Sequence, residues 1–295
     1  MNAKERGFLL LTSTLGDPRR MPLTVPQFRT LANRVRTMDK PEQSRELTEN
    51  DLVALGYDRK MALRITELLL GEGALTQYLH RGKTKDCFPI SRVSEEYPLA
   101  VRKRLGLDAP GCLWTKGDRD LLQTPSVALV GSRDLAESNR VFAETVGREA
   151  ARQGITLISG NARGADRTAQ EACLKEGGRV ICVIADGLQN YPLRKNILYL
   201  SEDGFDLPFS SQRALSRNRV IHSLGALTLV AQCTLGTGGT WDGALKNLRN
   251  HWSPVFVYED GSEAAEKLGQ MGATTVVAEQ LSDMPSLCAG IKPLI

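Results

Sequence analysis

The chain of 295 residues is long enough for about two domains, and its 41% hydrophobic and 24% charged residues argue against general disorder. A formal net charge of +4 does not by itself indicate a nucleic-acid partner. Clustering of the positively charged residues would be the stronger indication. None of the six cysteines forms a C-x-x-C pair, which disfavours a zinc ribbon or a redox dithiol. The apolar run at residues 8–11 is too short for a secretion signal, and no segment is long enough to span a bilayer. We therefore expect a cytoplasmic protein with reduced thiols.

Residues 1–82 are predicted to form a small helical domain. Apolar residues at helical spacing follow Pro26, and residues 48–51 are typical of a capping box. A further apolar pattern resumes at Met61 and ends at Gly71 and Gly73. Such a module can bind a DNA backbone, bind a partner protein or only pack, and the sequence leaves these roles open.

Residues 83–295 are predicted to form an α/β domain, because strand-like and helical segments alternate and so favour a mostly parallel sheet. In such folds ligands bind at the carboxyl ends of the strands. We expect strands near residues 112–114, 127–130, 156–158, 180–184, 227–231, 255–258 and 274–278. We expect helices at residues 136–153, 165–176, 193–202, 214–224, 243–251 and 264–271.

The turn after the strand at residues 127–130 consists of Gly131, Ser132 and Arg133. Glycine permits a tight exit from the strand, serine offers a hydroxyl, and arginine offers a two-pronged donor for a phosphate. Asp134 is expected to cap the next helix. Taken alone, this turn is equally compatible with an ordinary connection that carries a surface arginine.

A second turn, at residues 159–166, begins with Ser159. Gly160 and Gly164 allow close backbone approach, and Arg163 adds charge near a helix N-terminus. Asp166 fits a supporting role better than a catalytic one, and we expect it to hold an arginine of either turn. Because successive strands of a right-handed crossover are neighbours, the two turns should form one anion site.

Pro192 is expected to begin a helix that carries Lys195 and Tyr199. A cation and an aromatic ring one helical turn apart suit a phosphate and its base. The packing of Tyr199 into the core is the alternative.

The densest positive cluster consists of Arg213, Arg217 and Arg219 together with Asn218. No acidic residue close in the sequence neutralises it, which favours an anionic partner.

A third loop, with Gly238, Gly239 and Thr240, precedes the helix expected from Gly243. Its small residues suit close approach to a phosphate or sugar, and Asp242 is expected to cap that helix. This loop either extends a groove for a strand or forms a separate nucleotide pocket.

Several kinds of site are missing from the sequence. It contains no G-x-G-x-x-G dinucleotide fingerprint and no G-x-x-x-x-G-K-[ST] loop. Histidines and cysteines show no metal-ligand spacing, and neither a nucleophile elbow nor a carboxylate pair stands out. We expect anion and base binding without a cofactor or metal, rather than an enzyme.

The order of these motifs resembles the DNA-processing protein A (DprA/Smf) family from about residue 97 to residue 257. Any one motif is weak, but several in the same order are specific. They are Tyr97-Pro98, Trp114-x-Lys-Gly-Asp118, Val130-Gly-Ser-Arg133, Ser159-Gly-x-Ala-Arg-Gly-x-Asp166, Gly187-Leu188, Tyr191-Pro192, Arg217-Asn-Arg219 and Gly238-Gly-Thr240.

The resemblance implies an extended Rossmann-like domain that binds single-stranded DNA, preceded by a domain like a sterile alpha motif. It also implies a homodimer that protects strands in recombination, DNA uptake or natural transformation and passes them to a RecA-type recombinase. Arg133, Ser159, Gly160, Arg163, Arg217 and Arg219 match positions of the family that line or support the DNA groove.

The chain departs from the family pattern at Ala169-Gln170, at Lys195 in place of a common asparagine, and at the loop around Gly238. No C-terminal winged-helix domain is recognisable in the sequence. We therefore expect a divergent member, with service to a mobile element or a defence system as a further setting.

A nucleotide-binding or nucleotide-cleaving domain, similar to phosphoribohydrolases, is the alternative function. The loop at Gly238 is similar to the glycine-rich loop of those enzymes. Their nearby glutamate is missing, and Asp242 is the carboxylate in reach.

Overall fold

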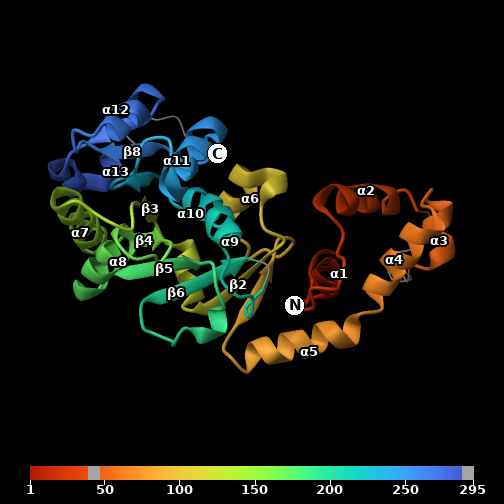
Figure 1. The fold of residues 1–295 in the computed structure, drawn as a ribbon. Helices are drawn as coiled ribbons and strands as arrows, with labels where there is room; N and C mark the ends of the chain where they lie inside the picture. Colours follow the sequence, from red (N-terminus) through yellow and green to blue (C-terminus); the bar gives the residue numbers. More distant parts are fainter. Residues whose placement is uncertain (39–46, 203, 288–295) are drawn as a thin grey trace.

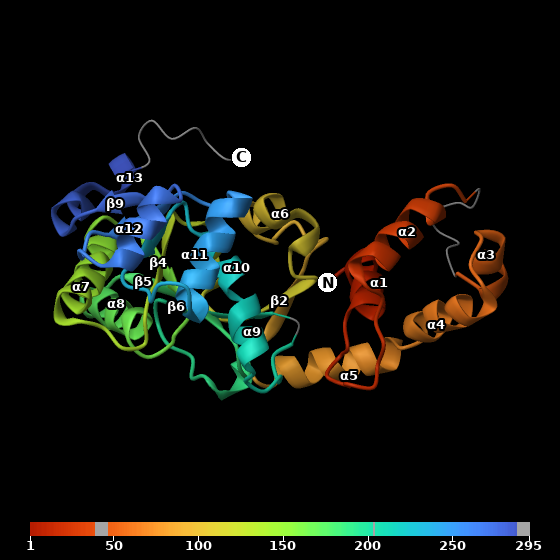
Figure 2. The ribbon, with the colours of Figure 1, turned by 45° about the horizontal axis from the view of Figure 1, so that its top comes forward.

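The structure, a computed structural model, describes residues 1–38, 47–202 and 204–287. A group of N-terminal helices lies to one side of an α/β unit and joins it through a single helix (Figure 1; Figure 2). The N-terminal helices are α1 (Ala3–Thr12), α2 (Val25–Val35), α3 (Glu49–Ala54), α4 (Arg59–Leu69) and the linking helix α5 (Glu72–Lys83).

Within the described residues, nine strands form one sheet in the order β1-β2-β6-β5-β4-β3-β7-β8-β9. The strands from β6 to β9 pair in parallel, whereas β1 and β2 form an antiparallel edge. Their bounds are β1 (Phe88–Ser91), β2 (Cys112–Gly117), β3 (Ser126–Val130), β4 (Thr156–Ser159), β5 (Arg179–Ile184), β6 (Ile197–Glu202), β7 (Thr228–Val230), β8 (Val255–Tyr258) and β9 (Thr274–Val276).

Helices cover both faces of this sheet, and the alternation of side chains along each strand explains why. Leu129 and Leu157 belong to the core on one face, whereas their neighbours Ala128 and Ile158 belong to the core on the other. The first face carries α7 (Glu137–Arg152), α8 (Ala165–Lys175) and α13 (Met284–Leu287). The second carries α6 (Leu99–Leu105), α10 (Asn218–Leu224), α11 (Gly238–Asn250) and α12 (Glu263–Gln270), with α9 (Ser211–Ser216) leading into α10. The predicted doubly wound, Rossmann-like class is confirmed.

The N-terminal helices owe their boundaries to local chemistry. Asn2, Thr24 and Thr48 each cap a helix, and a side chain three residues later returns the hydrogen bond. Part of their apolar surface forms a small core of its own, which consists of Leu11, Leu23, Leu31, Leu52, Ala62, Ile65 and Leu68. Phe8, Leu9 and Leu10 of α1 belong instead to the larger core on one face of the sheet.

The linking helix α5 also packs against the α/β unit. Tyr78 contacts Trp114 of β2 and Phe205, with ring centroids 5.2 Å and 4.9 Å away. Gly82 makes this packing close, because a Cβ there would lie 2.6 Å from Trp114 Cζ3.

The helix predicted at residues 193–202 is wrong, because residues 197–202 form β6. This strand lies between β5 and β2, and all six of its residues are buried. A strand buried on both faces reads as a continuous apolar run, which periodicity cannot distinguish from a buried helix.

Two other predicted helices have different bounds. The helix expected at residues 214–224 is divided at Arg217 into α9 and α10. The helix expected from Gly243 begins at Gly238, so the third predicted loop is the first turn of α11. Strand β1 and helix α6 were not predicted.

Candidate nucleic-acid interface

A cavity of about 880 Å³ opens at the carboxyl ends of β3 and β7. Strand β3 pairs with β4 on one side and with β7 on the other, so the chain changes direction across the sheet at this point. In open α/β sheets this is where ligands bind. The lining includes Gly131, Ser132, Arg133, Asp166, Phe209, Leu215, Arg217, Asn218, His222, Gly238, Gly239, Thr240 and Lys246.

The first two predicted turns lie side by side, as expected. The backbone N–H of Ala165 donates to the carbonyl oxygen of Ser132 over 3.1 Å. Gly164 has a φ of 83°, and a Cβ there would overlap the carbonyl oxygens of Ser132 and Arg133. Only glycine allows this approach, which brings both turns to one wall of the cavity.

Asp166 organises the second turn. Its Oδ2 accepts hydrogen bonds from the backbone N–H groups of Gly160 at 3.0 Å and Ala162 at 3.1 Å. Burial raises the pKa of its carboxyl, while nearby Arg217 and these two N–H groups oppose the rise. The predicted supporting role therefore agrees with the geometry, although Arg163 pairs with exposed Asp134 and not with Asp166.

Arg217 is a buried cation that faces the cavity. Only 8% of it is exposed, and its side chain makes no hydrogen bond or ion pair with any residue that the structure describes. Burial lowers the pKa of its guanidinium and nearby Arg133 acts in the same direction, while Asp166 opposes them. Two arginines therefore face one cavity with a single carboxylate between them, and an anion there would lower the cost of burying Arg217.

The first turn of α11 also lines the cavity, next to the turn after β3. The Thr240 hydroxyl donates to the carbonyl oxygen of Gly131 at 2.9 Å, and Asn218 Nδ2 donates to that of Gly239 at 3.2 Å. These bonds fix the positive end of a 13-residue helix beside the first turn. The third predicted motif thus joins the same site as the other two.

Asp242 and Asp134 do not cap helices, and both predictions were wrong. Helix α11 follows Thr237, so Asp242 lies in its second turn and pairs with Lys246 at 2.7 Å. Helix α7 follows Ala136, two residues beyond Asp134.

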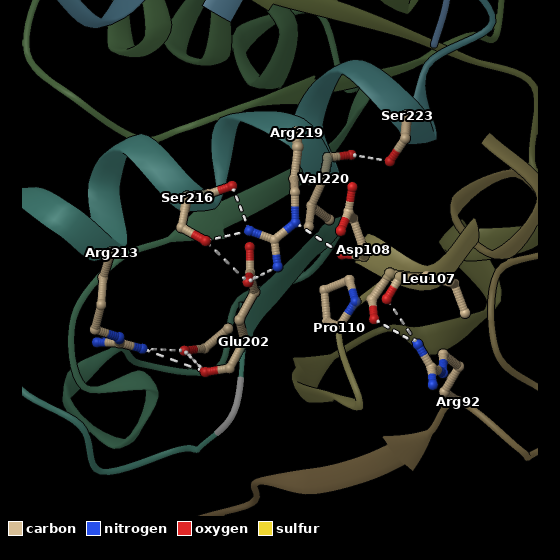
Figure 3. Close-up of polar contacts among 12 residues, drawn as sticks. Arg92, Leu107, Asp108, Pro110, Glu202, Arg213, Ser216, Arg219, Val220 and Ser223 are labelled. Carbon is tan, nitrogen blue, oxygen red and sulfur yellow. Dashed lines mark hydrogen bonds and ion pairs between the residues drawn. The ribbon is translucent and has the colours of Figure 1, made fainter. Parts of the chain in front are cut away.

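The expectation that no acidic residue neutralises the cluster of Arg213, Arg217 and Arg219 was wrong for Arg219, and Arg213 is also held by hydrogen bonds (Figure 3). Arg219 pairs with Glu202 of β6 at 2.8 Å and donates to the carbonyl oxygen of Asp108 at 3.0 Å. Arg213 donates to Ser201 Oγ at 3.0 Å and to the carbonyl oxygens of Ala185, Leu207, Pro208 and Glu202. Glu202 is distant in sequence, so nothing local in the sequence indicated these contacts.

Lys195 and Tyr199 are not part of the cavity lining. Lys195 is exposed in the turn that begins β6, next to Asn196, whose side chain bonds the carbonyl oxygen of Gly177 at 3.1 Å. That turn lies at the amino ends of the parallel strands, at the opposite edge of the sheet from the cavity. Tyr199 is 5% exposed and packs against Tyr191, so the alternative of a core residue describes it.

Ser159 lies beneath the site instead of lining it. The residue is fully buried, and its hydroxyl accepts a hydrogen bond from Gln170 of α8. Its role in the structure is to hold β4 and α8 together under the second turn.

Phe209 and His222 are among the lining residues that were not foreseen from the sequence. Asn247 Nδ2 donates to His222 Nδ1 at 3.2 Å, and the Asn247 oxygen is fixed by the N–H of Ser253 at 2.8 Å. Burial, aided by nearby Arg217, lowers the pKa of His222 to about 3. The ring is therefore neutral, with its proton on Nε2, which has no protein acceptor in the described part of the chain.

Within the described ranges, no group of three or more histidine, cysteine, aspartate or glutamate residues could hold a metal ion. No helix there is long and apolar enough to cross a membrane. Five cysteines are buried, and Cys288 lies outside the described residues.

Sequence comparison identifies relatives of this chain. DprA of Streptococcus pneumoniae is 31% identical over 208 residues, which cover 66% of this chain and 70% of that protein. Protein Smf of Escherichia coli is 32% identical over 189 residues, 57% of this chain and 49% of that protein. The chain therefore matches about half the length of the E. coli protein.

Two solved structures share the fold. The X-ray structure of DprA from S. pneumoniae has a TM-score of 0.73 at 24% identity and covers 98% of this chain and 99% of its own. A structure of the Helicobacter pylori protein, described for its single-stranded DNA binding mode, has a TM-score of 0.54 at 25% identity, covering 64% of this chain and 90% of its own. The model of the DNA recombination-mediator protein A family matches residues 89–286, most of the chain, and the chain belongs to this family.

Proposed function

We propose that this chain binds single-stranded DNA in recombination or DNA uptake, and that it does so without catalytic turnover. The observation that carries the proposal is Arg217, a buried cation with no protein partner among the described residues, beside Arg133 in a cavity of about 880 Å³. A phosphate would supply the missing negative charge, and the first turn of α11 lines the same cavity with its backbone N–H groups. Family membership and the H. pylori relative's DNA-binding mode support the choice of ligand.

The cavity offers binding groups and few reactive ones. Its carboxylates are Asp166, which is bound to two backbone N–H groups, and Asp242, which is paired with Lys246. His222 is neutral with its basic nitrogen turned to Asn247. This donor set supports binding over hydrolysis.

The test is fluorescence anisotropy with labelled single- and double-stranded oligonucleotides at two salt concentrations. Single strands should bind more tightly, and log K should fall against log salt with a slope of about −0.7 per phosphate neutralised. Arg133→Ala should weaken binding and reduce that slope by about 0.7. Lys195→Ala is the matched control, since Lys195 is also an exposed cation but lies at the amino ends of the parallel strands, away from the cavity. Equal affinity of parent and Arg133→Ala, or of single and double strands, would contradict the proposal.

Free nucleotides are the second candidate ligand, because the cavity volume lies within the range of about 300–1,000 Å³ usual for small-molecule pockets. A thermal-shift panel of mononucleotides separates the two functions. Stabilisation by a mononucleotide together with no binding of oligonucleotides would favour the second.

Family membership also supports a homodimer that passes its strand to a RecA-type recombinase in the cytoplasm. Size-exclusion chromatography with light scattering measures the oligomeric state. Strand exchange by a RecA-type recombinase, with and without this chain, measures the transfer.

A further inference from the structure

Phe209 presents an exposed aromatic ring at the cavity. All aromatic residues of the chain are described by the structure, and only Phe88 and Phe209 are exposed, at 39% and 57%. Phe88 lies on the edge strand β1, whereas Phe209 lines the cavity that also holds Arg133 and Arg217. Leu215, 48% exposed, lines the same cavity. Apolar area next to these two cations favours a ligand that has both a charge and a flat apolar face.

The backbone around Phe209 is held on both sides. Arg213 Nη1 donates to the carbonyl oxygens of Leu207 at 3.1 Å and Pro208 at 2.9 Å. Ser210 caps α9, because its Oγ accepts from the Arg213 backbone N–H at 3.1 Å. One arginine therefore fixes the residues before and after Phe209, while its ring stays in solvent.

The same loop is anchored to the N-terminal helices. The Tyr78 hydroxyl donates to Asp206 at 2.8 Å, and Arg81 faces the same carboxylate at 3.7 Å. The loop is thus tied to α5 and to α9. Little conformational entropy should therefore be lost when a ligand covers Phe209.

We propose that Phe209 is the stacking platform for a base of the bound strand, the role that the sequence had suggested for Tyr199. The inference rests on the proposed function, because it assumes that a strand enters the cavity. The phosphate lies at Arg133 and Arg217, and the attached base extends onto the ring of Phe209. Stacking on an aromatic face accepts every base, so this contact adds affinity without sequence preference.

The experiment compares an ordinary oligonucleotide with an abasic strand of the same length, which keeps the phosphates and lacks the bases. Phe209→Ala should weaken binding of the ordinary strand by about 5- to 150-fold, the usual range for one stacked base. Its affinity for the abasic strand should equal that of the parent. Phe88→Ala, the matched control, should change neither affinity.

Phe209→Trp supplies a direct signal. Trp114, Trp241 and Trp252 are 2%, 8% and 9% exposed, so a tryptophan at position 209 would be the exposed one. Its fluorescence should be quenched by the ordinary strand and not by the abasic strand. Phe209→Leu keeps apolar bulk without an aromatic face, and it should lose base-dependent affinity even if Phe209→Ala fails to fold.

The outcomes are distinct. Parental affinity of Phe209→Ala and Phe209→Leu for the ordinary strand overturns the inference, as does an equal loss for both strands. Failure of the parent to bind any strand overturns the proposed function instead.

Discussion

The guanidinium of Arg217 packs against the backbone of Gly160, the residue that follows β4. A Cβ at position 160 would overlap Nη1 and Nη2 of Arg217, so glycine there is a condition for the position of the buried cation. Asp166 links the same two groups a second time. Its carboxylate accepts a hydrogen bond from the Gly160 N–H at 3.0 Å and interacts electrostatically with Arg217.

Gly160→Ala should therefore displace Arg217 and weaken strand binding by at least about tenfold, the order of one charge-assisted hydrogen bond. Anisotropy with a single-stranded oligonucleotide measures the change. Gly73→Ala is the control, because a Cβ at this α5 position meets no atom within 4 Å. It should stabilise the protein by about 0.5–1 kcal/mol and leave binding unchanged. Parental affinity in Gly160→Ala would show that the position of Arg217 does not matter.

Thr240 connects the first turn of α11 to the turn after β3 through its hydroxyl bond to Gly131. Thr240→Val keeps the shape but removes the donor, and it should lower the free energy of unfolding by about 1 kcal/mol and weaken strand binding. Thr240→Ser keeps the donor and should bind as the parent does. Urea unfolding and anisotropy measure the two effects, and identical behaviour of the two variants would count against the role of this bond.

Arg213 should contribute more to stability than any exposed arginine. Its guanidinium bonds the carbonyl oxygens of residues 185, 202, 207 and 208 and a serine hydroxyl, and Arg213→Lys cannot satisfy all of them. We expect a loss of about 2–4 kcal/mol in urea unfolding, together with weaker binding of ordinary strands. Arg152→Ala, which removes a surface pair with Glu149, should cost less than about 1 kcal/mol. Similar losses in the two variants would refute this assignment.

His222 should make the protein less stable in acid. Its pKa falls from 6.5 to about 3 on folding, so between these values the unfolded chain binds a proton that the folded chain does not. The free energy of unfolding therefore decreases as the pH falls below 6.5, and this histidine should account for about 2 kcal/mol between pH 7 and pH 5. His222→Asn should remove this pH-dependent loss of about 2 kcal/mol, as measured by urea unfolding at pH 7 and at pH 5. The same change at exposed His251 should leave the pH profile like that of the parent, and an unaltered profile in His222→Asn would contradict the prediction.

The meeting of the two turns at the cavity was largely predictable because each turn is encoded locally. A short apolar strand followed by small residues and an arginine specifies both the turn after β3 and the turn after β4, and the crossover rule places them together. Strand β6 was not predictable. All of its residues are buried, so its sequence lacks the alternation of apolar and polar residues that marks a strand with one exposed face.

Long-range pairing explains the other errors. Glu202 reaches Arg219 from the middle of the sheet, and Arg213 is satisfied by carbonyl oxygens of residues 185, 207 and 208. Charge counting along the sequence cannot detect such partners. Phe209 carried no signal in the sequence, since only its exposure beside the cavity distinguishes it from a core residue.

The packing of Tyr78 against Trp114 and Phe205 has a consequence for dividing this protein into parts. The boundary predicted between residues 82 and 83 follows the sequence pattern, yet a cut there would separate aromatic rings whose centroids lie about 5 Å apart. Either fragment would then expose apolar surface that the intact chain conceals. Calorimetry of the whole chain should accordingly record α5 and the β2 edge of the sheet melting as one cooperative unit.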